Sequence, residues 1–356
     1  MHGRSGRGLS GSAARFTESE RPSSRLRPMR ILVTGGAGFI GSHCAKRLAA
    51  AGDEIVVLDK LTYSGNRANL EGADLEFVQG DIADRDAVST AAEGCEAILN
   101  FAAETHVDRS IFGAAEFIET DVLGTYVLLD YVREHGVRFV QVSTDEVYGD
   151  VPEGASSKED DPLRPSSPYA ASKAGGDLQV LAAVRTYGVN ASITRGSNTY
   201  GPNQYPEKII PLFVTNALEG ESLPVYGDGR QTRDWLHVDD HCSGIELVLR
   251  GGGPGEIYNV GGGEEVENRD LTARILQLTG ADESLIRHVE DRPGHDRRYS
   301  LDTSKLRDLG WEPKRTLADG LPETVAWYRD NREWWEPIKS GEYLAYYRRQ
   351  YAARLS

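Results

Sequence analysis

The sequence predicts an α/β protein that begins with a doubly wound parallel sheet and continues into a second, smaller mixed α/β domain. Short apolar runs rich in β-branched residues, such as 30–34 and 137–143, lack a helical period, which is typical of strands buried in a parallel sheet. The regular alternation of strands and helices gives way to loops in the second half, and 356 residues suffice for two domains. We therefore expect the first domain at 29–194, with a return of the chain near 238–260, and the second at 195–356.

The first strand, 30–34, leads into a glycine-rich turn. Gly35, Gly38 and Gly41 match the spacing GxxGxxG, and the helix that follows runs to about residue 51. Glycines at this spacing let the backbone approach a pyrophosphate at the amino end of the helix. Because a strand precedes the turn and a helix follows it, the segment predicts a dinucleotide-binding site.

The second strand, 54–58, supports the same prediction. It ends at Asp59, about twenty residues after the turn, where a carboxylate accepts hydrogen bonds from ribose hydroxyls. An acidic residue there would repel a 2′-phosphate, so the sequence favours NAD as the cofactor. Lys60 and Arg67 lie close enough in the sequence to leave NADP open.

Two later strands each end in a segment that faces the same edge of the sheet. Asp81 follows the strand at 75–78, and we expect it to meet the adenine. The segment 101–103, Phe-Ala-Ala, follows the strand at 97–100 and should line the cofactor. A tight loop is the alternative explanation for either segment.

The strand at 137–143 delivers three polar residues to the sheet edge. Thr144, Asp145 and Glu146 follow it directly. Ligands of open α/β sheets bind at the carboxyl ends of the strands, so two adjacent carboxyl groups there are placed for chemistry. A turn also favours aspartate, which leaves a structural explanation of Asp145 open.

Tyr169 and Lys173 stand four residues apart in the segment PYAASKA, which should open a helix. Both side chains would then project from one face of the helix. A nearby positive charge, here Lys173 together with the nicotinamide of a bound cofactor, favours the phenolate and could bring a tyrosine that normally titrates near ~10 within reach of neutral pH as a base. A surface pair is the alternative, and the preceding cofactor turn argues against it.

With these residues assembled, the chain resembles the extended short-chain dehydrogenase/reductase superfamily, which has a Rossmann fold, and within it the dTDP-glucose 4,6-dehydratases. The resemblance covers Met29 to about Arg349. Epimerases of the same fold normally lack an Asp-Glu pair after the Ser-Thr. The resemblance is carried by the segments 34–42, 58–70, 100–110, 143–149, 167–173, 197–211, 225–242 and 291–301.

This resemblance implies a role for each catalytic candidate. Tyr169 would take the proton of the sugar 4-hydroxyl as hydride passes to NAD, while Lys173 holds the ribose and Thr144 bonds the same sugar oxygen. Glu146 would then remove the proton of carbon 5, and protonated Asp145 would give one to the departing 6-hydroxyl. Hydride returns to carbon 6, which makes a 4-keto-6-deoxy sugar nucleotide.

The resemblance also implies the binding residues. Thr105 would contact the hexose, Pro224 and Tyr226 would lie by the base, and further residues would bind the diphosphate, namely Asn198, Lys208, Arg233, Arg292 and His295. The implied cofactor residues are Gly35, Gly38, Phe39, Ile40, Gly41, Asp59, Lys60, Thr62, Asp81, Ile82, Ala102, Ala103, Tyr169 and Lys173.

Two departures bear on the substrate. Thr105 stands where the family usually has serine, and Thr199 stands in a run that is commonly Ser-Asn-Asn-Tyr. A UDP-, CDP- or GDP-linked sugar is therefore an alternative to dTDP-glucose.

A 4-epimerase or decarboxylase is disfavoured by the Asp-Glu pair, and a noncatalytic NAD-binding sensor should have lost one of the catalytic residues. We expect His241 to be a packing residue.

Composition predicts the setting of the protein. A net charge of −15 argues for a cytoplasmic protein and against binding of nucleic acid, and no apolar stretch approaches membrane-spanning length. Three cysteines fit reduced thiols, and the histidines show no metal-ligand spacing. We interpret 1–28 as a disordered tail, from an incorrectly assigned start codon or, alternatively, a targeting peptide. The resemblance implies a homodimer through helices near 117–134 and 169–187.

Overall fold

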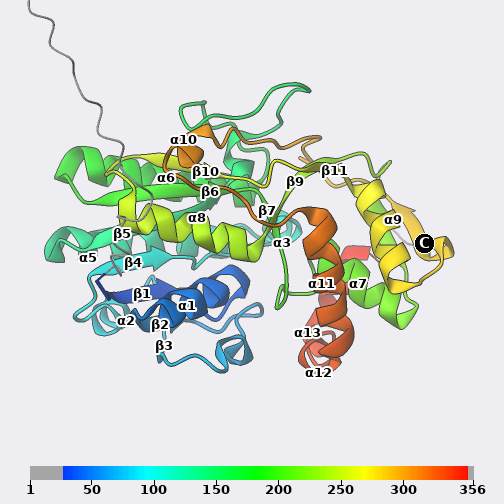
Figure 1. Ribbon diagram of the computed structural model, residues 1–356, viewed down its shortest axis with the longest axis horizontal. Helices are drawn as coiled ribbons and strands as arrows, with labels where there is room; N and C mark the ends of the chain where they lie inside the picture. Colours follow the sequence, from blue (N-terminus) through cyan, green and yellow to red (C-terminus); the bar gives the residue numbers. More distant parts are fainter. Residues whose placement is uncertain (1–26, 352–356) are drawn as a thin grey trace, which may run out of the picture.

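A computed structural model describes residues 27–351 of the chain. The predicted tail at 1–28 therefore lies almost entirely outside the described residues. The model contains a large parallel sheet with helices on both faces, and a smaller group of strands and helices at one end of it (Figure 1). The predicted doubly wound α/β fold is confirmed, and the division into two domains at residue 194 stays a prediction.

The large sheet has seven strands, all parallel, in the order β10-β6-β5-β4-β1-β2-β3. The strand order reverses between β1 and β4, and ligands of open α/β sheets bind at such a switch point. The strands are β1 (Arg30–Thr34), β2 (Glu54–Asp59), β3 (Glu76–Gln79), β4 (Ala97–Asn100), β5 (Arg138–Thr144), β6 (Ala191–Gly196) and β10 (Ile257–Val260).

Helices cover both faces of this sheet because its strands are apolar on both sides. Ile31 and Val33 of β1 belong to a core shared with α1 and α8, whereas Leu32 belongs to a core shared with α2, α5 and α6. The helices of this part are α1 (Phe39–Ala51), η2 (Arg67–Leu70), α2 (Arg85–Ala91), α3 (Val107–Phe112), α4 (Ala115–Phe117), the π-helix η3 (Ile118–Gly124), α5 (Thr125–His135), η4 (Asp145–Tyr148), α6 (Pro168–Tyr187) and α8 (Val238–Gly251).

The chain returns to the sheet late in the sequence, as predicted. Helix α8 packs on α1, and β10 pairs with β6 in parallel. The predicted helix near 117–134 is a continuous helical stretch whose middle turn is π-helical. The π-helical turn makes the helix wider where it packs on α6. Turns of this kind are frequent at functional sites.

The smaller part has its own core around Tyr200, Trp235 and Trp335. Three strands, β7 (Asn198–Tyr200), β9 (Thr232–His237) and β11 (Glu265–Glu267), form a mixed sheet, and β8 (Leu223–Tyr226) pairs with β12 (Ile286–Val289). Its helices are α7 (Ile209–Glu219), α9 (Asn268–Thr279), η5 (Glu283–Leu285), α11 (Leu317–Asp330), α12 (Arg332–Trp335) and α13 (Gly341–Tyr351). The short helix α10 (Ser304–Asp308) packs instead on β10 of the large sheet.

Between residues 27 and 351, no helix combines the length and the apolar character needed to cross a bilayer. Over the same range, no three side chains of His, Cys, Asp or Glu gather into a group that could hold a metal ion.

Candidate active site

The predicted site residues line two adjoining cavities at the carboxyl edge of the large sheet. The cavities share Glu146, Asn198, Glu207 and Lys208, so they meet at the catalytic candidates. Every predicted cofactor residue lines the first cavity, together with Thr105, Thr144, Asp145 and Glu146. The second cavity is lined by the remaining predicted substrate residues: Asn198, Lys208, Pro224, Tyr226, Arg233, Arg292 and His295.

The glycine turn after β1 fits a close approach of backbone to a dinucleotide. Gly35 has φ of +63°, and a Cβ there would lie 2.6 Å from the backbone nitrogen of Ala102. A Cβ on Gly41 would lie 2.4 Å from the carbonyl oxygen of Gly35. No side chain caps the first turn of α1, so its backbone N–H groups are available to an anion.

The acidic residue after β2 is tied to that turn. Asp59 accepts hydrogen bonds from the backbone nitrogens of Ala37 (2.9 Å) and Leu61 (2.8 Å), which orient its carboxylate at the cavity. Burial raises the pKa of Asp59, and the two backbone bonds oppose that rise. A carboxylate at this position would repel the negative charge of a 2′-phosphate.

The two cations that left NADP open have other partners. Lys60 Nζ lies 2.7 Å from Oδ2 of Asp81, and Arg67 stacks on the ring of Phe77, with its guanidinium carbon 4.4 Å from the ring centroid. Both positive charges are thus engaged within the protein. The geometry favours NAD over NADP at this cavity.

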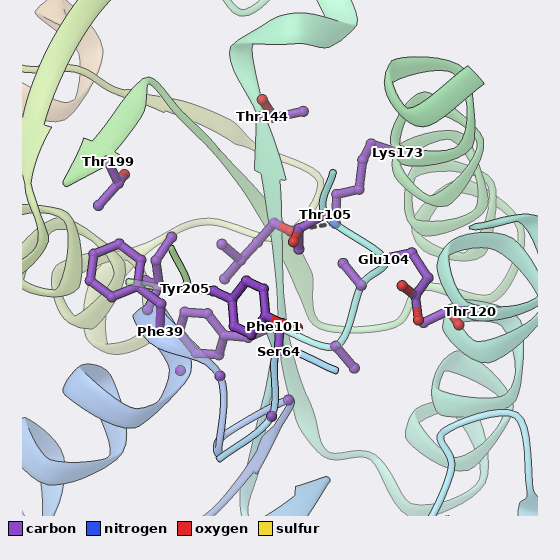
Figure 2. A pocket seen from close by; sticks show the side chains of 18 of the residues that line it. Phe39, Ser64, Phe101, Glu104, Thr105, Thr120, Thr144, Lys173, Thr199 and Tyr205 are labelled. Atoms are coloured by element: carbon purple, nitrogen blue, oxygen red, sulfur yellow. Dashed lines mark hydrogen bonds between the residues drawn. The ribbon is translucent and has the colours of Figure 1, made fainter. Parts of the chain in front are cut away.

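The catalytic candidates converge from β5 and α6. Thr144 ends β5 and caps the short helix η4, because its hydroxyl accepts a hydrogen bond from the backbone nitrogen of Glu146 (3.2 Å) and donates one to Oδ1 of Asp145 (3.1 Å). Tyr169 lies in the first turn of α6, behind the capping residue Ser167. Figure 2 shows Lys173 pointing from α6 into the cavity that Thr144 also lines.

The two adjacent carboxyl groups have unlike surroundings. Burial, with the neighbouring Glu146 carboxyl, raises the pKa of Asp145 to about 8, so Asp145 is protonated at neutral pH. Burial also raises the pKa of Glu146, but Arg292, Lys208 and Arg233 act against this rise and favour its charged form. One carboxyl is thus suited to give a proton and the other to take one.

Tyr169 is a buried phenol in the protein alone. Burial, the Glu146 carboxyl and the Asp121 carboxyl raise the pKa of Tyr169 well above its usual value, and a hydrogen bond with Thr144 opposes this. Lys173 donates its Nζ hydrogen bond to the carbonyl oxygen of Val142 (2.9 Å). Burial dominates in the protein alone, and the prediction that Lys173 together with the nicotinamide brings the pKa of Tyr169 toward neutral pH stays a prediction.

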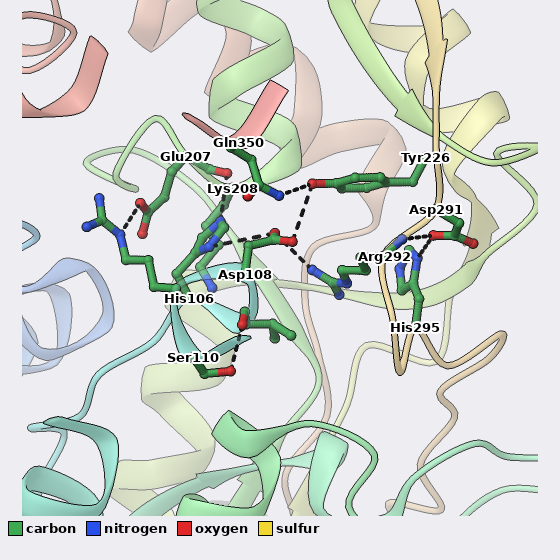
Figure 3. A network of polar contacts seen from close by, with 12 residues as sticks. His106, Asp108, Ser110, Glu207, Lys208, Tyr226, Asp291, Arg292, His295 and Gln350 are labelled. Atoms are coloured by element: carbon green, nitrogen blue, oxygen red, sulfur yellow. Dashed lines mark hydrogen bonds and ion pairs between the residues drawn. The ribbon is translucent and has the colours of Figure 1, made fainter. Parts of the chain in front are cut away.

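Cationic side chains converge on the second cavity, as Figure 3 shows for Lys208 and Arg292. Lys208 donates a hydrogen bond to the carbonyl oxygen of Thr105, which lines the first cavity rather than the second. Arg292 Nη1 lies 3.2 Å from Oδ2 of Asp108, and its Nε is buried without a partner among the described residues. Arg233 also lines this cavity. Three cations at one cavity suit phosphate oxygens.

His295 is a neutral member of the second cavity. Its Nδ1 lies 2.6 Å from Oδ1 of Asp291, and burial lowers the pKa of His295 to about 4. Its ring meets the ring of Tyr226 edge-on at 5.8 Å between centroids. We conclude that His295 contributes hydrogen bonding and shape rather than charge at neutral pH.

Sequence reasoning missed several residues of the site. Asn268 and Tyr351 line the second cavity and lie in no motif, whereas Glu207 lines both cavities and lies in the segment 197–211, where it was given no role. His241, expected to be a packing residue, also lines the first cavity, with its Nδ1 2.8 Å from Oγ1 of Thr199. Its Nε2 is buried without a partner in the described part of the chain.

This fold and this site define an enzyme of the extended short-chain dehydrogenase/reductase type with a carboxyl pair for acid–base chemistry. The family model described as GDP-mannose 4,6 dehydratase matches residues 32–324. The dTDP-glucose 4,6-dehydratase of Streptomyces niveus is 56% identical over 324 residues, which cover 88% of this chain and 96% of that protein. The chain belongs to the dTDP-glucose 4,6-dehydratases.

Two solved structures place this relationship in context. The dTDP-glucose 4,6-dehydratase of Streptomyces venezuelae with NAD and TYD bound superposes with a TM-score of 0.85 at 57% identity, over 87% of this chain and all of that one. The UDP-glucose 4-epimerase of Thermus thermophilus in complex with NAD reaches a TM-score of 0.81 at 34% identity, over 85% of this chain. The fold is thus shared between chemistries, which the site residues must separate.

Proposed function

We propose that this protein is an NAD-dependent dehydratase that converts dTDP-glucose to dTDP-4-keto-6-deoxyglucose. The observation that carries the proposal is the pair Asp145 and Glu146, adjacent in the chain but in unlike electrostatic surroundings, at the junction of the two cavities. An epimerase needs to remove and return a hydride but has no use for an acid and a base that expel water. The dTDP-glucose 4,6-dehydratases to which the chain is similar support the same activity.

The first cavity fits NAD. The glycine turn approaches the backbone at Ala102 too closely for any side chain, and the uncapped start of α1 offers N–H groups to a pyrophosphate. Asp59 would bind the ribose of the adenosine half, and Asp81 would lie by the adenine. When bound, NAD takes the hydride of carbon 4, later returns it to carbon 6, and in its oxidised form favours the phenolate through its positive charge.

Tyr169 would take the proton of the 4-hydroxyl. Its phenol is buried in the protein alone, where desolvation keeps it protonated. Thr144 would bond the same sugar oxygen, and Lys173 would exchange the carbonyl of Val142 for a ribose hydroxyl. Tyr169 is thus protonated in the protein alone and would become an active base once NAD is bound in the first cavity.

Elimination then falls to the two carboxyl groups. A keto group at carbon 4 makes the proton of carbon 5 acidic, so Glu146, whose ionised form is favoured by three cations, can remove it. Asp145 carries a proton at neutral pH and can give it to the departing 6-hydroxyl as the carbon–oxygen bond breaks. Water leaves, and carbons 5 and 6 are joined by a double bond that is ready for reduction.

The second cavity would bind the nucleoside diphosphate. The protein is acidic overall, and Lys208, Arg233 and Arg292 supply local positive charge at this cavity. Asn198 lies where the two cavities join. Pro224 and Tyr226, on β8, would lie against the base. These roles are proposals that substitution of each residue can test.

The decisive experiment is to incubate the purified protein with a panel of nucleotide hexoses linked to dTDP, UDP, CDP and GDP. We expect a 4-keto-6-deoxy product from dTDP-glucose at the highest kcat/KM. A product that keeps its 6-hydroxyl would contradict dehydration, and a preference for another nucleotide would correct the substrate.

We also propose a homodimer in the cytoplasm. Large apolar side chains are exposed on the helical stretch of η3 and α5 and on α6, at Ile118 (57%), Leu123 (47%), Leu178 (57%) and Tyr187 (59%). Burial of such a face in a second copy is the usual outcome. Light scattering should give twice the mass of one chain, and Leu178→Glu should shift it toward the monomer. The charge of −15 and three free cysteines support the cytoplasm.

A further inference from the structure

The C-terminal helix α13 forms part of the wall of the second cavity. The hydroxyl of Tyr346 lies 3.1 Å from Nδ1 of His106, a cavity residue, and the hydroxyl of Tyr343 donates a hydrogen bond to the carbonyl oxygen of Pro206 (2.9 Å). Tyr351, at the end of the helix, lines the cavity itself. These polar contacts hold α13 against the proposed nucleotide site.

Gln350 in that last turn is a polar residue in a buried place. Its side chain is 2% exposed, and its Nε2 donates a hydrogen bond of 2.7 Å to the hydroxyl of Tyr226. Its Oε1 is buried without a partner among residues 27–351. A buried amide with one unpaired atom is unfavourable unless its other contacts or a ligand compensate for it.

Tyr226 is the residue that Gln350 orients. Besides Gln350, its hydroxyl donates to Oδ1 of Asp108 over 3.4 Å, and its ring meets that of His295 edge-on. The guanidinium of Arg292 lies 5.9 Å from the Tyr226 ring centroid and is paired with the same Asp108 carboxylate. Figure 3 shows this chain of contacts, which joins the ring to the cation.

These contacts link three distant parts of the sequence. Asp108 lies on α3, Tyr226 ends β8, and Gln350 lies on α13. Because the Tyr226 hydroxyl has partners on α3 and α13, its ring is fixed from two sides. The bond from Gln350 is shorter, at 2.7 Å, than the contacts of this hydroxyl with Asp108 (3.4 Å) and with the hydroxyl of Tyr351 (3.5 Å).

We propose that Gln350 is a positioning residue for the nucleoside diphosphate part of the substrate, because it holds the ring of Tyr226 and, through Asp108, the guanidinium of Arg292 in place. The inference rests on the proposed function, since it takes the second cavity as the nucleotide site. Gln350 itself need not touch the reacting sugar. Its effect is on affinity for the nucleotide rather than on the chemistry of carbons 4, 5 and 6.

The test is the affinity of the holoenzyme for dTDP, measured by titration calorimetry. Gln350→Leu keeps the bulk of the side chain and removes its hydrogen bonds, so Kd should rise about 3- to 10-fold, the effect of one net hydrogen bond. The NAD content of the purified protein should stay the same. The matched control is Tyr347→Phe, which removes a hydroxyl of the same helix that accepts from Asn216 (3.4 Å), outside the network of Asp108, Tyr226 and Gln350.

Two further measurements separate positioning from simple destabilisation of the helix. Tyr226→Phe should weaken dTDP binding at least as much as Gln350→Leu, because it also removes the contact with Asp108. The double variant should bind no more weakly than Tyr226→Phe alone, since the hydroxyl that Gln350 contacts is already absent. With dTDP-glucose as substrate, KM should rise by a larger factor than kcat falls in Gln350→Leu.

The inference is overturned if Gln350→Leu binds dTDP within about twofold of the parent, or if Tyr347→Phe weakens binding as much, since either result assigns no special role to the Tyr226 contact. A parent enzyme that retains NAD but binds no dTDP would overturn the proposed substrate as well. Normal dTDP binding by the parent with no keto product would count against the proposed reaction alone.

Discussion

Replacing Glu146 by glutamine should separate oxidation of the sugar from elimination of water. Glutamine preserves the size of a side chain that lies at the junction of the two cavities, but it cannot take a proton. If Glu146 is the base that acts on carbon 5, the variant should still oxidise the 4-hydroxyl. The reaction should then stop with the 4-keto sugar bound and the cofactor reduced.

The expected magnitude follows from the role and the surroundings of Glu146. A positioned general base contributes about 10²- to 10⁴-fold, which corresponds to roughly 3–5 kcal/mol of barrier, so overall turnover should fall by that factor. Oxidation should not slow through electrostatics, because the Glu146 carboxyl raises the pKa of Tyr169 and its removal lowers that pKa. The pKa of Asp145 should fall for the same reason.

The assay is a single turnover with dTDP-glucose in deuterated water. Absorbance of the reduced nicotinamide should rise and persist, and exchange of the carbon 5 hydrogen with solvent should stall. Glu153→Gln, at an exposed glutamate outside both cavities, serves as the control and should behave as the parent. Normal exchange at carbon 5 in Glu146→Gln would refute the reasoning and assign the base elsewhere.

Three other outcomes are expected. Tyr169→Phe should abolish oxidation while NAD stays bound, and unchanged turnover would remove Tyr169 as the base. Asp145→Asn should be inactive yet more heat-stable. The fold raises the pKa of Asp145 to about 8, so the folded state keeps a proton that the unfolded state releases near ~4. The carboxyl therefore lowers the free energy of unfolding progressively as pH rises between those two values. The gain in Tm should be larger at about pH 8 than at about pH 5, and equal gains would contradict the raised pKa. Deuterium at carbon 4 of dTDP-glucose should reach the new 6-methyl group despite excess unlabelled NADH, whereas label in the free cofactor pool would indicate an ordinary dehydrogenase.

Much of the cofactor cavity could be predicted because its signals are local. The turn from Gly35 to Gly41 needs glycine at position 35 for its positive φ and at position 41 for the close approach to the Gly35 carbonyl, and Asp59 follows at the end of the next strand. The adjacent residues Asp145 and Glu146 reach the same edge because the carboxyl ends of parallel strands share it. Such features survive in the sequence as short motifs.

The wall of the substrate cavity had no such signal. Tyr351 and Gln350 come from the last turn of the described chain, and Asp108 meets Arg292 across 184 positions of sequence. No local spacing encodes these contacts, since they exist only once the second part of the chain has packed against the first. His241 was assigned to packing for the same reason, and the tertiary structure places its ring in the cofactor cavity.

The sequence by itself determined the fold class, the cofactor turn and the identity of the reacting groups, because period, glycine spacing and adjacency are properties of short segments. Only the tertiary structure decided the charge states of those groups. Burial of Asp145 beside Glu146, and the three cations brought to Glu146 from distant parts of the chain, set which carboxyl holds the proton. Tyr169 shows the same limit, since in the protein alone its pKa depends on burial and on the Glu146 and Asp121 carboxyls, which its spacing from Lys173 does not encode.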